Sequence, residues 1–379
     1  MLTGMLTTLL GPILPVLSLR WSLSDSQAGS LFTSQFLGSM MGAAISSPLM
    51  MRQGYQLSLV LGFAMMATGV CALASLSTWV AGLISVFCYG VGLGITIPTT
   101  NLWIAQANPT RRAAALNLLN LAWGAGAVTC PFLVALAQRT KSVPVLLFGL
   151  ATAACFLLVC IASVSFASIG QTLEGRLDPL PLGRNVWRTP FLPILGVLFL
   201  LYVGTENALA GWVATYAQRM GATPGMVWVL MPSFFWGALL LGRTLAPTVL
   251  RYAAEATLVR VGLGLAAIGV ATLLVVKTQS GVALGASLAG FGLASVFPIL
   301  VALLSETFGT QALRVAGALF ACGGLGGATL PWLVGVASTH FGSLKAGLVV
   351  PLLGSLIMIA LCVVSRRATM SNSGELGAR

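Results

Sequence analysis

Long apolar stretches separated by short polar breaks run along the whole chain. Each stretch is about as long as the roughly 20 residues that cross a bilayer as one α-helix. The breaks contain proline, glycine or charged residues, which are typical of helix ends. The pattern predicts an all-α membrane protein with twelve transmembrane helices, at residues 1–19, 27–51, 55–77, 79–106, 112–138, 143–167, 190–218, 225–250, 256–276, 280–304, 312–339 and 344–365.

One long polar stretch, from Ser168 to Arg188, separates the sixth predicted helix from the seventh. It holds two acidic residues, three arginines and two prolines, a composition typical of a loop. We therefore predict an N-terminal six-helix half at residues 1–167 and a C-terminal six-helix half at 189–367. Residues 168–188 form the cytoplasmic linker between them, and residues 368–379 form a cytoplasmic tail.

The composition excludes a water-soluble globule. Of the 379 residues, 58% are hydrophobic and only 7% are charged, whereas an ordinary soluble domain has roughly 25% charged residues. The net charge of +12 raises the question of a nucleic-acid partner. However, the basic residues are scattered singly at the ends of apolar stretches instead of gathering on one face, so we expect no nucleic-acid binding.

The same basic residues predict the orientation. An even number of helices places both termini on one side, and that side holds twelve arginines in its loops and tail, against six basic residues on the other. Cytoplasmic loops carry the excess of Lys and Arg in membrane proteins. We therefore expect a multi-pass protein of the bacterial inner (plasma) membrane with both termini in the cytoplasm, and we interpret the first apolar stretch as a helix, not a signal peptide.

Residues for enzymatic chemistry are scarce. The single histidine, His340, cannot by itself build a His-based metal site or a Ser-His-Asp triad. The seven cysteines all lie inside apolar stretches without a CxxC pair, and no GxxxxGK[ST] phosphate loop is present. We expect neither an enzyme nor an ATP-driven pump, and no metal or cofactor.

An internal repeat relates the two halves. At an offset of 200 residues, glycines and prolines of the first half meet the same residue types in the second, as Gly90 meets Gly290, Pro98 meets Pro298 and Gly126 meets Gly326. At an offset of 199, Arg52 meets Arg251, so the same basic residue follows helices two and eight. Parallel repeats of six helices are the layout of major facilitator transporters.

The residues around Arg52 carry a family resemblance. Residues 47–54, which read SPLMMRQG, lie in the loop where the major facilitator superfamily carries G-x-x-x-D-R-x-G; Arg52 and Gly54 match, and Met51 replaces the acid. The chain resembles that superfamily over essentially its whole length. The resemblance implies two six-helix halves around a central solute site, with Arg52 and Arg251 as gating residues.

Within the superfamily, three stretches resemble the fucose and glucose permease branch most, at residues 202–216, 117–126 and 235–243. This resemblance implies cation-coupled uptake of a sugar or a similar polar metabolite.

Glu206 is the one acid predicted well inside an apolar helix. An ionised side chain at a helix centre costs about 2.5 to 3.5 kcal/mol on insertion scales, so we expect it to be neutralised, paired or in contact with a wet cavity. Since burial disfavours the ionised form of a carboxyl group, Glu206 is our candidate proton carrier, and a structural bond between two helices is the alternative. Asn207 can add an oxygen ligand for Na⁺ or can bond a neighbouring helix.

Arg243 is the one basic residue far from a predicted loop. It can bind an anionic solute, pair with Glu206 or extend to the inner interface. From the rise per residue, Glu206 and Arg243 differ in depth by roughly 10 Å, so we expect no direct pairing.

Amide and aromatic side chains supply the remaining candidates for solute binding. Asn117 and Asn120 share one face of helix five with Gly124, and paired amides suit polyol recognition. Aromatic rings can stack on a sugar ring, and bonds between helices are the alternative role for every amide. The candidate solute-binding residues are Asn117, Asn120, Trp123, Asn101, Gln35, Tyr202, Trp236 and Arg243.

Together these features favour a secondary active transporter that moves a small polar solute, most simply a sugar, by H⁺-coupled symport with rocker-switch alternating access. Na⁺ coupling through Glu206 and Asn207 is the closest variant. A proton-antiport exporter of drugs or metabolites is a further alternative, as is a receptor or scaffold, although a scaffold would not need Glu206. We expect a monomer in the lipid bilayer, with a small-molecule substrate as its partner.

Overall fold

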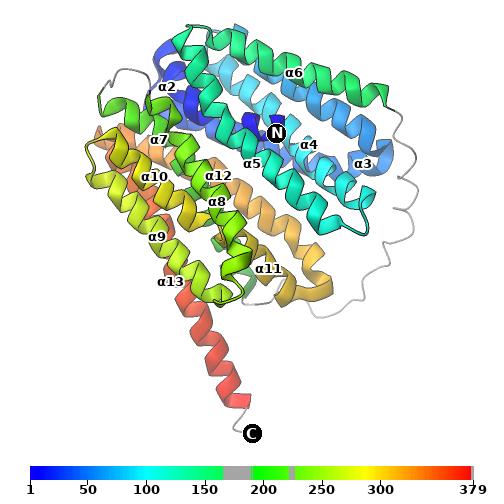
Figure 1. Ribbon diagram of the computed structural model, residues 1–379, viewed down its shortest axis with the longest axis vertical. Coiled ribbons are helices and arrows are strands. Elements are labelled where there is room, and N and C mark those ends of the chain that lie inside the picture. The colour runs from blue at the N-terminus through cyan, green and yellow to red at the C-terminus, as the bar shows by residue number, and fades with distance from the viewer. Residues whose placement is uncertain (165–188, 190, 222–226, 377–379) are drawn as a thin grey trace.

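A computed structural model describes residues 1–164, 189, 191–221 and 227–376. The predicted linker at 168–188 and residues 377–379 lie outside the described residues. Every regular element within these ranges is helical. Figure 1 shows α3 to α6 packed on one side of the bundle and α8 to α11 on the other.

The first six spans form what we call the N-terminal set. Its first span is broken into two short helices, bent by 46° at Leu9. The set consists of α1 (Leu2–Thr8), α2 (Leu10–Arg20), α3 (Asp25–Ser75), α4 (Trp79–Ala107), α5 (Arg112–Arg139) and α6 (Val143–Ser163).

The last six spans form the C-terminal set. Two 3₁₀ turns, η3 (Val227–Leu230) and η4 (Gly309–Gln311), precede α8 and α12. The set's helices are α7 (Phe191–Arg219), α8 (Met231–Val249), α9 (Glu255–Val275), α10 (Gln279–Leu293), α11 (Val296–Phe308), α12 (Ala312–Phe341) and α13 (Leu344–Leu376).

Twelve membrane crossings can be counted in the described residues. Ten helical segments are long and apolar enough to cross a membrane, and the bent pair α1 and α2 makes an eleventh. The 51-residue α3 supplies one more, because Gly54 kinks it with φ 78° and ψ 174°, a backbone region that essentially only glycine adopts. The prediction of twelve transmembrane helices is therefore confirmed, with the break between the second and third crossings formed by a kink.

Three predicted boundaries differ from the observed ones. The span predicted at 280–304 is divided between α10 and α11, because Pro298 has no N–H to donate to the carbonyl of Ala294, where the helix breaks. The span predicted to begin at 225 opens with the 3₁₀ turn η3, and α8 begins only at Met231. The last helix continues past 365 to Leu376, because charged residues end an apolar span without ending a helix.

The internal repeat recurs in the packing. A Cβ at Gly90 would collide with the backbone of Gln35, and one at Gly290 would collide with the backbone of Phe235, the equivalent contact in the other set. Equivalent helix caps recur as well, since the Thr78 and Thr278 side chains accept bonds from the backbone three residues on, at the starts of α4 and α10. Repeated glycines thus set equally close helix approaches in both sets.

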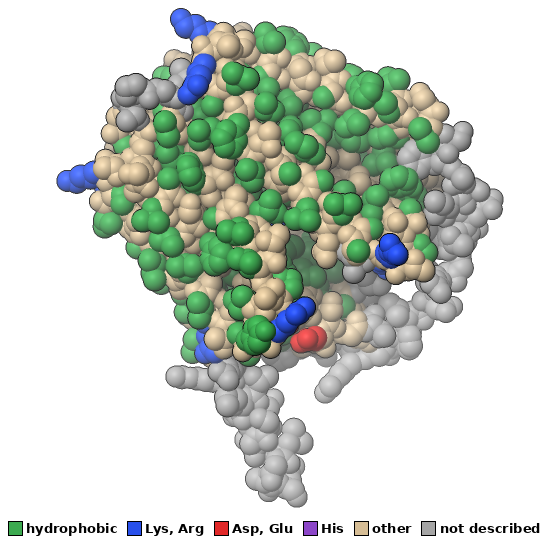
Figure 2. All heavy atoms as spheres, in the orientation of Figure 1, with side chains coloured by type: hydrophobic (Ala, Val, Ile, Leu, Met, Phe, Trp, Pro, Cys, Tyr) green, Lys and Arg blue, Asp and Glu red, His purple; other side chains and the backbone are tan. Residues whose placement is uncertain are grey.

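The most extensive contacts between the two sets are those of α3 with α12, α5 with α8, and α2 with α7. The 200-residue repeat relates α3 to α8 and α5 to α12, so the first two pairs are equivalent to each other. Outside these contacts many large hydrophobic side chains are exposed. In Figure 2, hydrophobic side chains cover much of the visible face, and the Lys and Arg side chains lie toward its edges.

Candidate functional site

Three side chains form a polar cluster between α7 and α8. The Tyr202 hydroxyl donates to Glu206 Oε1 at 3.0 Å, as their spacing of one helical turn on α7 allows. Arg243 of α8 donates from Nη2 both to the Tyr202 oxygen, at 3.2 Å, and to Glu206 Oε1, at 3.3 Å. One arginine nitrogen therefore bridges a hydroxyl and a carboxylate.

The expectation that Glu206 and Arg243 do not pair is wrong. Their N–O distance of 3.3 Å makes an ion pair. The depth estimate assumed that the seventh and eighth helices stand straight and that their apolar stretches begin at the membrane surface, yet α8 begins six residues after its predicted start. The long arginine side chain covers the remaining distance along the helix axis.

Glu206 is buried, and it is the only acid among the described residues that is. Its side chain is 11% exposed, whereas that of Arg243 is 31% exposed. The Nε of Arg243 is inaccessible to solvent and has no hydrogen-bond partner in the described part of the chain. The guanidinium of Arg243 is therefore only partly paired, and its side chain is partly exposed.

A small polar cavity lies beside this cluster, where α1, α2, α3, α7 and α8 meet. Gln35, Asn207 and Trp236, all predicted for the solute site, line it together with Thr7 and Thr8. Its volume of about 10 Å³ is about that of one water site. The conformation thus holds these polar side chains close together and leaves no room for a solute among them.

Several of the predicted amides make local bonds. Gln35 is buried, donates to the Thr7 carbonyl at 3.0 Å and accepts from the Tyr89 hydroxyl at 3.3 Å. Asn101 and Asn207 each donate to the backbone carbonyl four residues earlier. Only Gln35 makes the bonds between helices that the alternative role requires, whereas Asn101 and Asn207 bond within their own helices; Gln35 and Asn207 also face the small cavity.

The predicted residues of α5 lie toward α8. A Cβ at Gly124 would contact Leu240 of α8, and Trp123 packs edge-on against Trp236 with ring centroids 5.7 Å apart. Asn120 and Asn117 lie respectively one and two turns before Gly124 on the same face, and both are exposed. The structure therefore brings the two tryptophans together and leaves both asparagines accessible.

The predicted gating arginines are exposed at helix ends. Arg52 precedes the kink at Gly54, and Arg251 follows α8. Neither forms an ion pair or a side-chain hydrogen bond with a described residue. Met51, in the place of the family's acid, is 66% exposed. We call this side of the bundle the Arg52 end.

At the opposite end, a polar contact that the sequence did not predict joins the two sets. Asp25, at the start of α3, forms an ion pair with Arg219, at the end of α7, with Nη1 and Oδ2 2.8 Å apart. Ser338 of α12 donates to the same carboxylate. The only signal in the sequence is that the predicted spans leave both charges in loops on the same side of the membrane, Asp25 between 1–19 and 27–51 and Arg219 between 190–218 and 225–250.

Contacts between the sets continue from this Asp25 end toward the middle of the bundle. Along α3 and α12, the Thr33 hydroxyl donates to the Ala328 carbonyl, and Met40 packs where a Cβ at Gly324 would lie. Beyond Met40, toward Arg52, Met41 and Ile45 are 43% and 42% exposed. The two sets are thus in contact from the Asp25 end to the middle and separate toward the Arg52 end.

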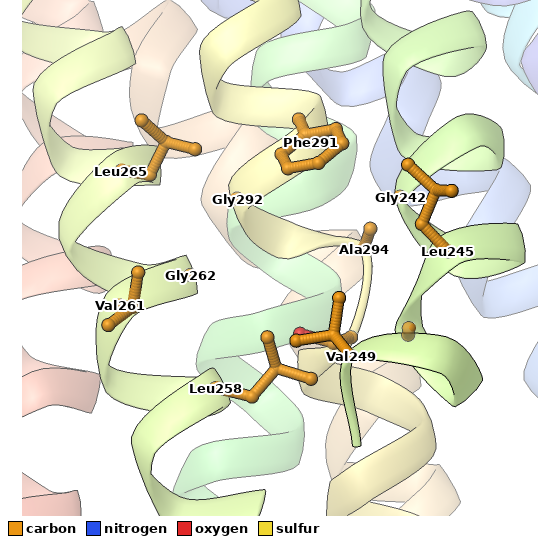
Figure 3. Close-up of a pocket in the computed structure, with 12 residues that line it drawn as sticks. Gly242, Leu245, Val249, Leu258, Val261, Gly262, Leu265, Phe291, Gly292 and Ala294 are labelled. Atoms are coloured by element: carbon orange, nitrogen blue, oxygen red, sulfur yellow. The ribbon is translucent and has the colours of Figure 1, made fainter. Parts of the chain in front are cut away.

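A second cavity, of about 80 Å³, lies between α8, α9 and α10 (Figure 3). Leu258, Leu265 and Phe291 line it, together with small residues at close helix contacts, Gly242, Gly262, Gly292 and Ala294. Its lining is apolar apart from Ser295. It offers no charge or amide to a polar solute and lies within the C-terminal set, so it is not the candidate site.

Comparisons with known proteins agree with this architecture. The family model of the Major Facilitator Superfamily matches residues 1–331. An uncharacterised MFS-type transporter of Bacillus subtilis strain 168, YfkF, is 23% identical over 241 residues. That alignment covers 61% of this chain and 59% of the relative, so the chain spans less than two thirds of the relative's length.

Solved structures match over nearly the whole chain. The crystal structure of a bacterial homologue of the human lysosomal transporter Spinster, in an inward-facing and occupied conformation, has a TM-score of 0.77 at 12% identity, covering 97% of this chain and 95% of that one. The crystal structure of a D-xylose-proton symporter has a TM-score of 0.70 at 18% identity, covering 94% of each chain. At such identities these matches establish the fold, and the family model establishes membership: this chain belongs to the major facilitator superfamily, whose members are membrane transporters and not enzymes.

Proposed function

We propose that this chain is a proton-coupled symporter of a small polar solute, with Glu206 as the proton carrier. The observation that carries the proposal is the cluster of Tyr202, Glu206 and Arg243 between α7 and α8, in which Tyr202 and Glu206 are buried. A carboxyl group this far from water is stable either when it is ionised and paired or when it is protonated. Both forms are accessible to Glu206, because its partner lies on a different helix.

The coupling follows from the exchange between these two forms. Ionised Glu206 holds α7 and α8 together through Arg243, and protonation removes the charge that attracts the guanidinium. Protonation of Glu206 therefore shifts the equilibrium between the conformations in which α7 and α8 are held together and those in which they are not. A solute that binds one of these conformations more tightly also favours the protonation state of Glu206 that stabilises it.

The distribution of contacts supports alternating access. The two sets touch from the Asp25 end to the middle and are separated toward the Arg52 end, so we expect a solute to approach the cluster around Glu206 from the Arg52 end. The excess of arginines at the Arg52 end indicates that this side is cytoplasmic, in a bacterial inner membrane, with Arg52 and Arg251 acting in the gate there. Closing that end and opening the Asp25 end would expose the cluster to the other side.

The solute is expected to bind between the exposed asparagines of α5 and the aromatic pair. Asn117 and Asn120 supply donors and acceptors for hydroxyl groups, and Trp123 and Trp236 supply an apolar surface for a ring or carbon chain. A sugar, as in the D-xylose-proton symporter of the same fold, fits these groups, and so does any similarly hydroxylated metabolite.

Transport by reconstituted protein tests the proposal. Proteoliposomes preloaded with one of several unlabelled sugars or sugar acids are screened for counterflow of the labelled compound, and accumulation of a transported compound is then driven by an imposed pH step. Glu206→Gln keeps the size and some hydrogen bonding of the side chain but cannot ionise. We expect it to abolish accumulation in response to the pH step and to spare counterflow.

Two results decide against proton coupling through Glu206. If Glu206→Gln still concentrates solute after a pH step, another group carries the proton. If only a sodium step drives the wild type, Na⁺ replaces H⁺ as the coupling ion, with the carboxylate of Glu206 and the amide oxygen of Asn207 as its ligands. Glu255→Gln is the matched control, since this exposed acid at the start of α9 lies outside the cluster.

A further inference from the structure

Arg243 has hydrogen-bonding capacity that the protein does not use. A guanidinium carries five N–H donors arranged to bind a carboxylate through two parallel bonds. Both bonds that Arg243 makes to described residues come from the same nitrogen, Nη2, at 3.2 and 3.3 Å, longer than the roughly 2.7 to 2.9 Å of strong charge-assisted bonds. Its Nε, in contrast, is buried without a partner in the described part of the chain.

The charge of this region is balanced by one pair alone. Arg243 and Tyr202 are the only described titratable groups that interact with Glu206. The elements packed most extensively against α7 are α2, α8, α10, α11, α12, α13 and η3, and α3 contacts it through Asp25 and Phe32. The other described charged or histidine side chains of these elements lie at or near helix ends or beside the kink of α3, at Arg20, Asp25, Arg52, Glu306, His340 and Lys345. When Glu206 takes up a proton, Arg243 is therefore left as an unpaired cation.

From these observations we propose that the transported solute carries a carboxylate, which binds Arg243 in place of Glu206. This inference rests on the proposed function and narrows its substrate class to small organic anions. One anion enters with one proton: the proton neutralises Glu206, and the carboxylate restores the counter-ion of Arg243. The occupied cluster then carries the same net charge as the empty one, so no uncompensated charge is left inside the apolar bundle during the conformational change.

The rest of the solute is expected to be hydroxylated. Trp236 lies two helical turns before Arg243 on the same face of α8, at an axial distance of about 10 Å. Asn207, Thr7 and Thr8 line the small cavity beside Trp236, and their amide and hydroxyl oxygens can accept hydrogen bonds from a solute when a change of conformation widens this cavity. An extended six-carbon chain with a carboxylate at one end and hydroxyl groups along its length suits this arrangement, which points to sugar acids over neutral sugars.

Binding measurements on the full-length protein in detergent test this inference without a transport assay. The probe is sodium gluconate, and its dissociation constant is obtained from the rise in the midpoint of thermal unfolding with ligand concentration. Sorbitol, which lacks the carboxylate but keeps the polyol chain, and sodium chloride at the same ionic strength are the controls. The proteins are the wild type, Glu206→Gln, and the double variant Glu206→Gln/Arg243→Gln.

We expect gluconate to bind Glu206→Gln at least about tenfold more tightly than it binds the wild type at about pH 8, because no carboxylate of the protein competes for the guanidinium. The double variant should lose this binding, and sorbitol should stabilise none of the three proteins to the same extent. In the wild type, lowering the pH to about 5.5 should also tighten gluconate binding, because protonated Glu206 no longer competes for Arg243. This measurement does not depend on the folding of a variant.

Equal affinity of the wild type and Glu206→Gln for gluconate would overturn the inference, as would binding that survives in the double variant or that sorbitol reproduces.

The outcomes separate this inference from the proposed function. Gluconate binding through Arg243 together with intact accumulation by Glu206→Gln removes the coupling role and keeps the anion site. Loss of accumulation by Glu206→Gln without Arg243-dependent gluconate binding removes the anion site alone.

Discussion

The Tyr202 hydroxyl has two partners, since it donates to Glu206 and accepts from Arg243, and it lies on a side chain only 1% exposed. Tyr202→Phe removes both bonds while it keeps the packing of the ring. Removal of a buried hydrogen-bonding partner costs about 1 to 3 kcal/mol, so the variant should unfold at a lower temperature in detergent than the wild type. Calorimetry or intrinsic fluorescence during heating measures the change.

Tyr252→Phe is the matched control for this prediction. Its side chain is 87% exposed, so loss of its hydroxyl should leave the unfolding temperature nearly unchanged. If the two phenylalanine variants unfold at the same temperature, the hydroxyl of Tyr202 does not hold the cluster together.

At this scale the sequence predicted the acid but not its partner. Glu206 was identified because a single carboxyl within a long apolar stretch is rare and costly. Its pairing with Arg243 depends on helix tilt, on the late start of α8 and on one side-chain conformation, none of which residue spacing specifies. Asp25 lies before the span predicted at 27–51, whereas in the structure it begins α3 and binds Arg219, 194 residues away in the chain.

At the scale of single helices, glycine positions set the packing. A Cβ at Gly290 of α10 would collide with the backbone of Phe235, and backbone atoms cannot move aside as the end of a flexible side chain can. Gly290→Ala should therefore lower the free energy of unfolding by about 1 to 3 kcal/mol, the usual cost of overpacking. Gly90→Ala should have the same effect in the N-terminal set, where the equivalent contact is with Gln35.

Gly264→Ala on α9 is the control for these variants, because a Cβ there would meet nothing within 4 Å. Alanine favours a helix over glycine by up to about 1 kcal/mol, so this variant should be as stable as the wild type or slightly more stable. Thermal unfolding of the three variants in the same detergent compares them directly. If Gly290→Ala and Gly264→Ala are equally stable, the repeated glycines do not determine how closely the helices approach.

The number and order of the helices could be predicted from the sequence, because apolar length and breaks report membrane crossings directly. Local irregularities could not. Pro298 and Pro98 occupy equivalent positions of the repeat, yet the helix breaks only before Pro298, and α4 continues through Pro98. The outcome depends on the neighbouring helices, which can compensate for a missing backbone bond at one site and not at the other.

At the scale of the whole molecule, the conformation is set by which ends of the two sets are in contact. The ion pair of Asp25 and Arg219 and the bond from Ser338 hold the Asp25 end together, and no equivalent ion pair joins the sets at the Arg52 end in the described residues. The charged side chains of this contact come from both sets. It can therefore form only when the Asp25 end is closed.

Loss of the Asp25 charge should make the Asp25 end open more often. The probe is a cysteine at Phe32, a side chain 5% exposed that packs against Gly211 and Trp212 between the sets, in a chain whose seven native cysteines have been replaced. The rate at which a water-soluble maleimide modifies Phe32→Cys reports how often this end opens. A partly exposed ion pair contributes about 1 kcal/mol, so Asp25→Asn should raise the rate roughly fivefold.

The exchange of charges in the double variant Asp25→Arg/Arg219→Asp keeps an ion pair between the same two helix ends, and it should return the rate toward that of the unaltered pair. Lys277→Gln serves as the control for charge alone, because this exposed lysine follows α9 near the same end and bridges nothing between the sets in the described residues.

A single conformational equilibrium also predicts an opposite change at the other end. A cysteine at Asn120, which is exposed when the sets separate toward Arg52, should react more slowly in Asp25→Asn than in the parent chain. If modification at Phe32 accelerates while modification at Asn120 stays constant, the Asp25 end opens by local fraying, and the two ends are not coupled through a rocking motion of the two sets.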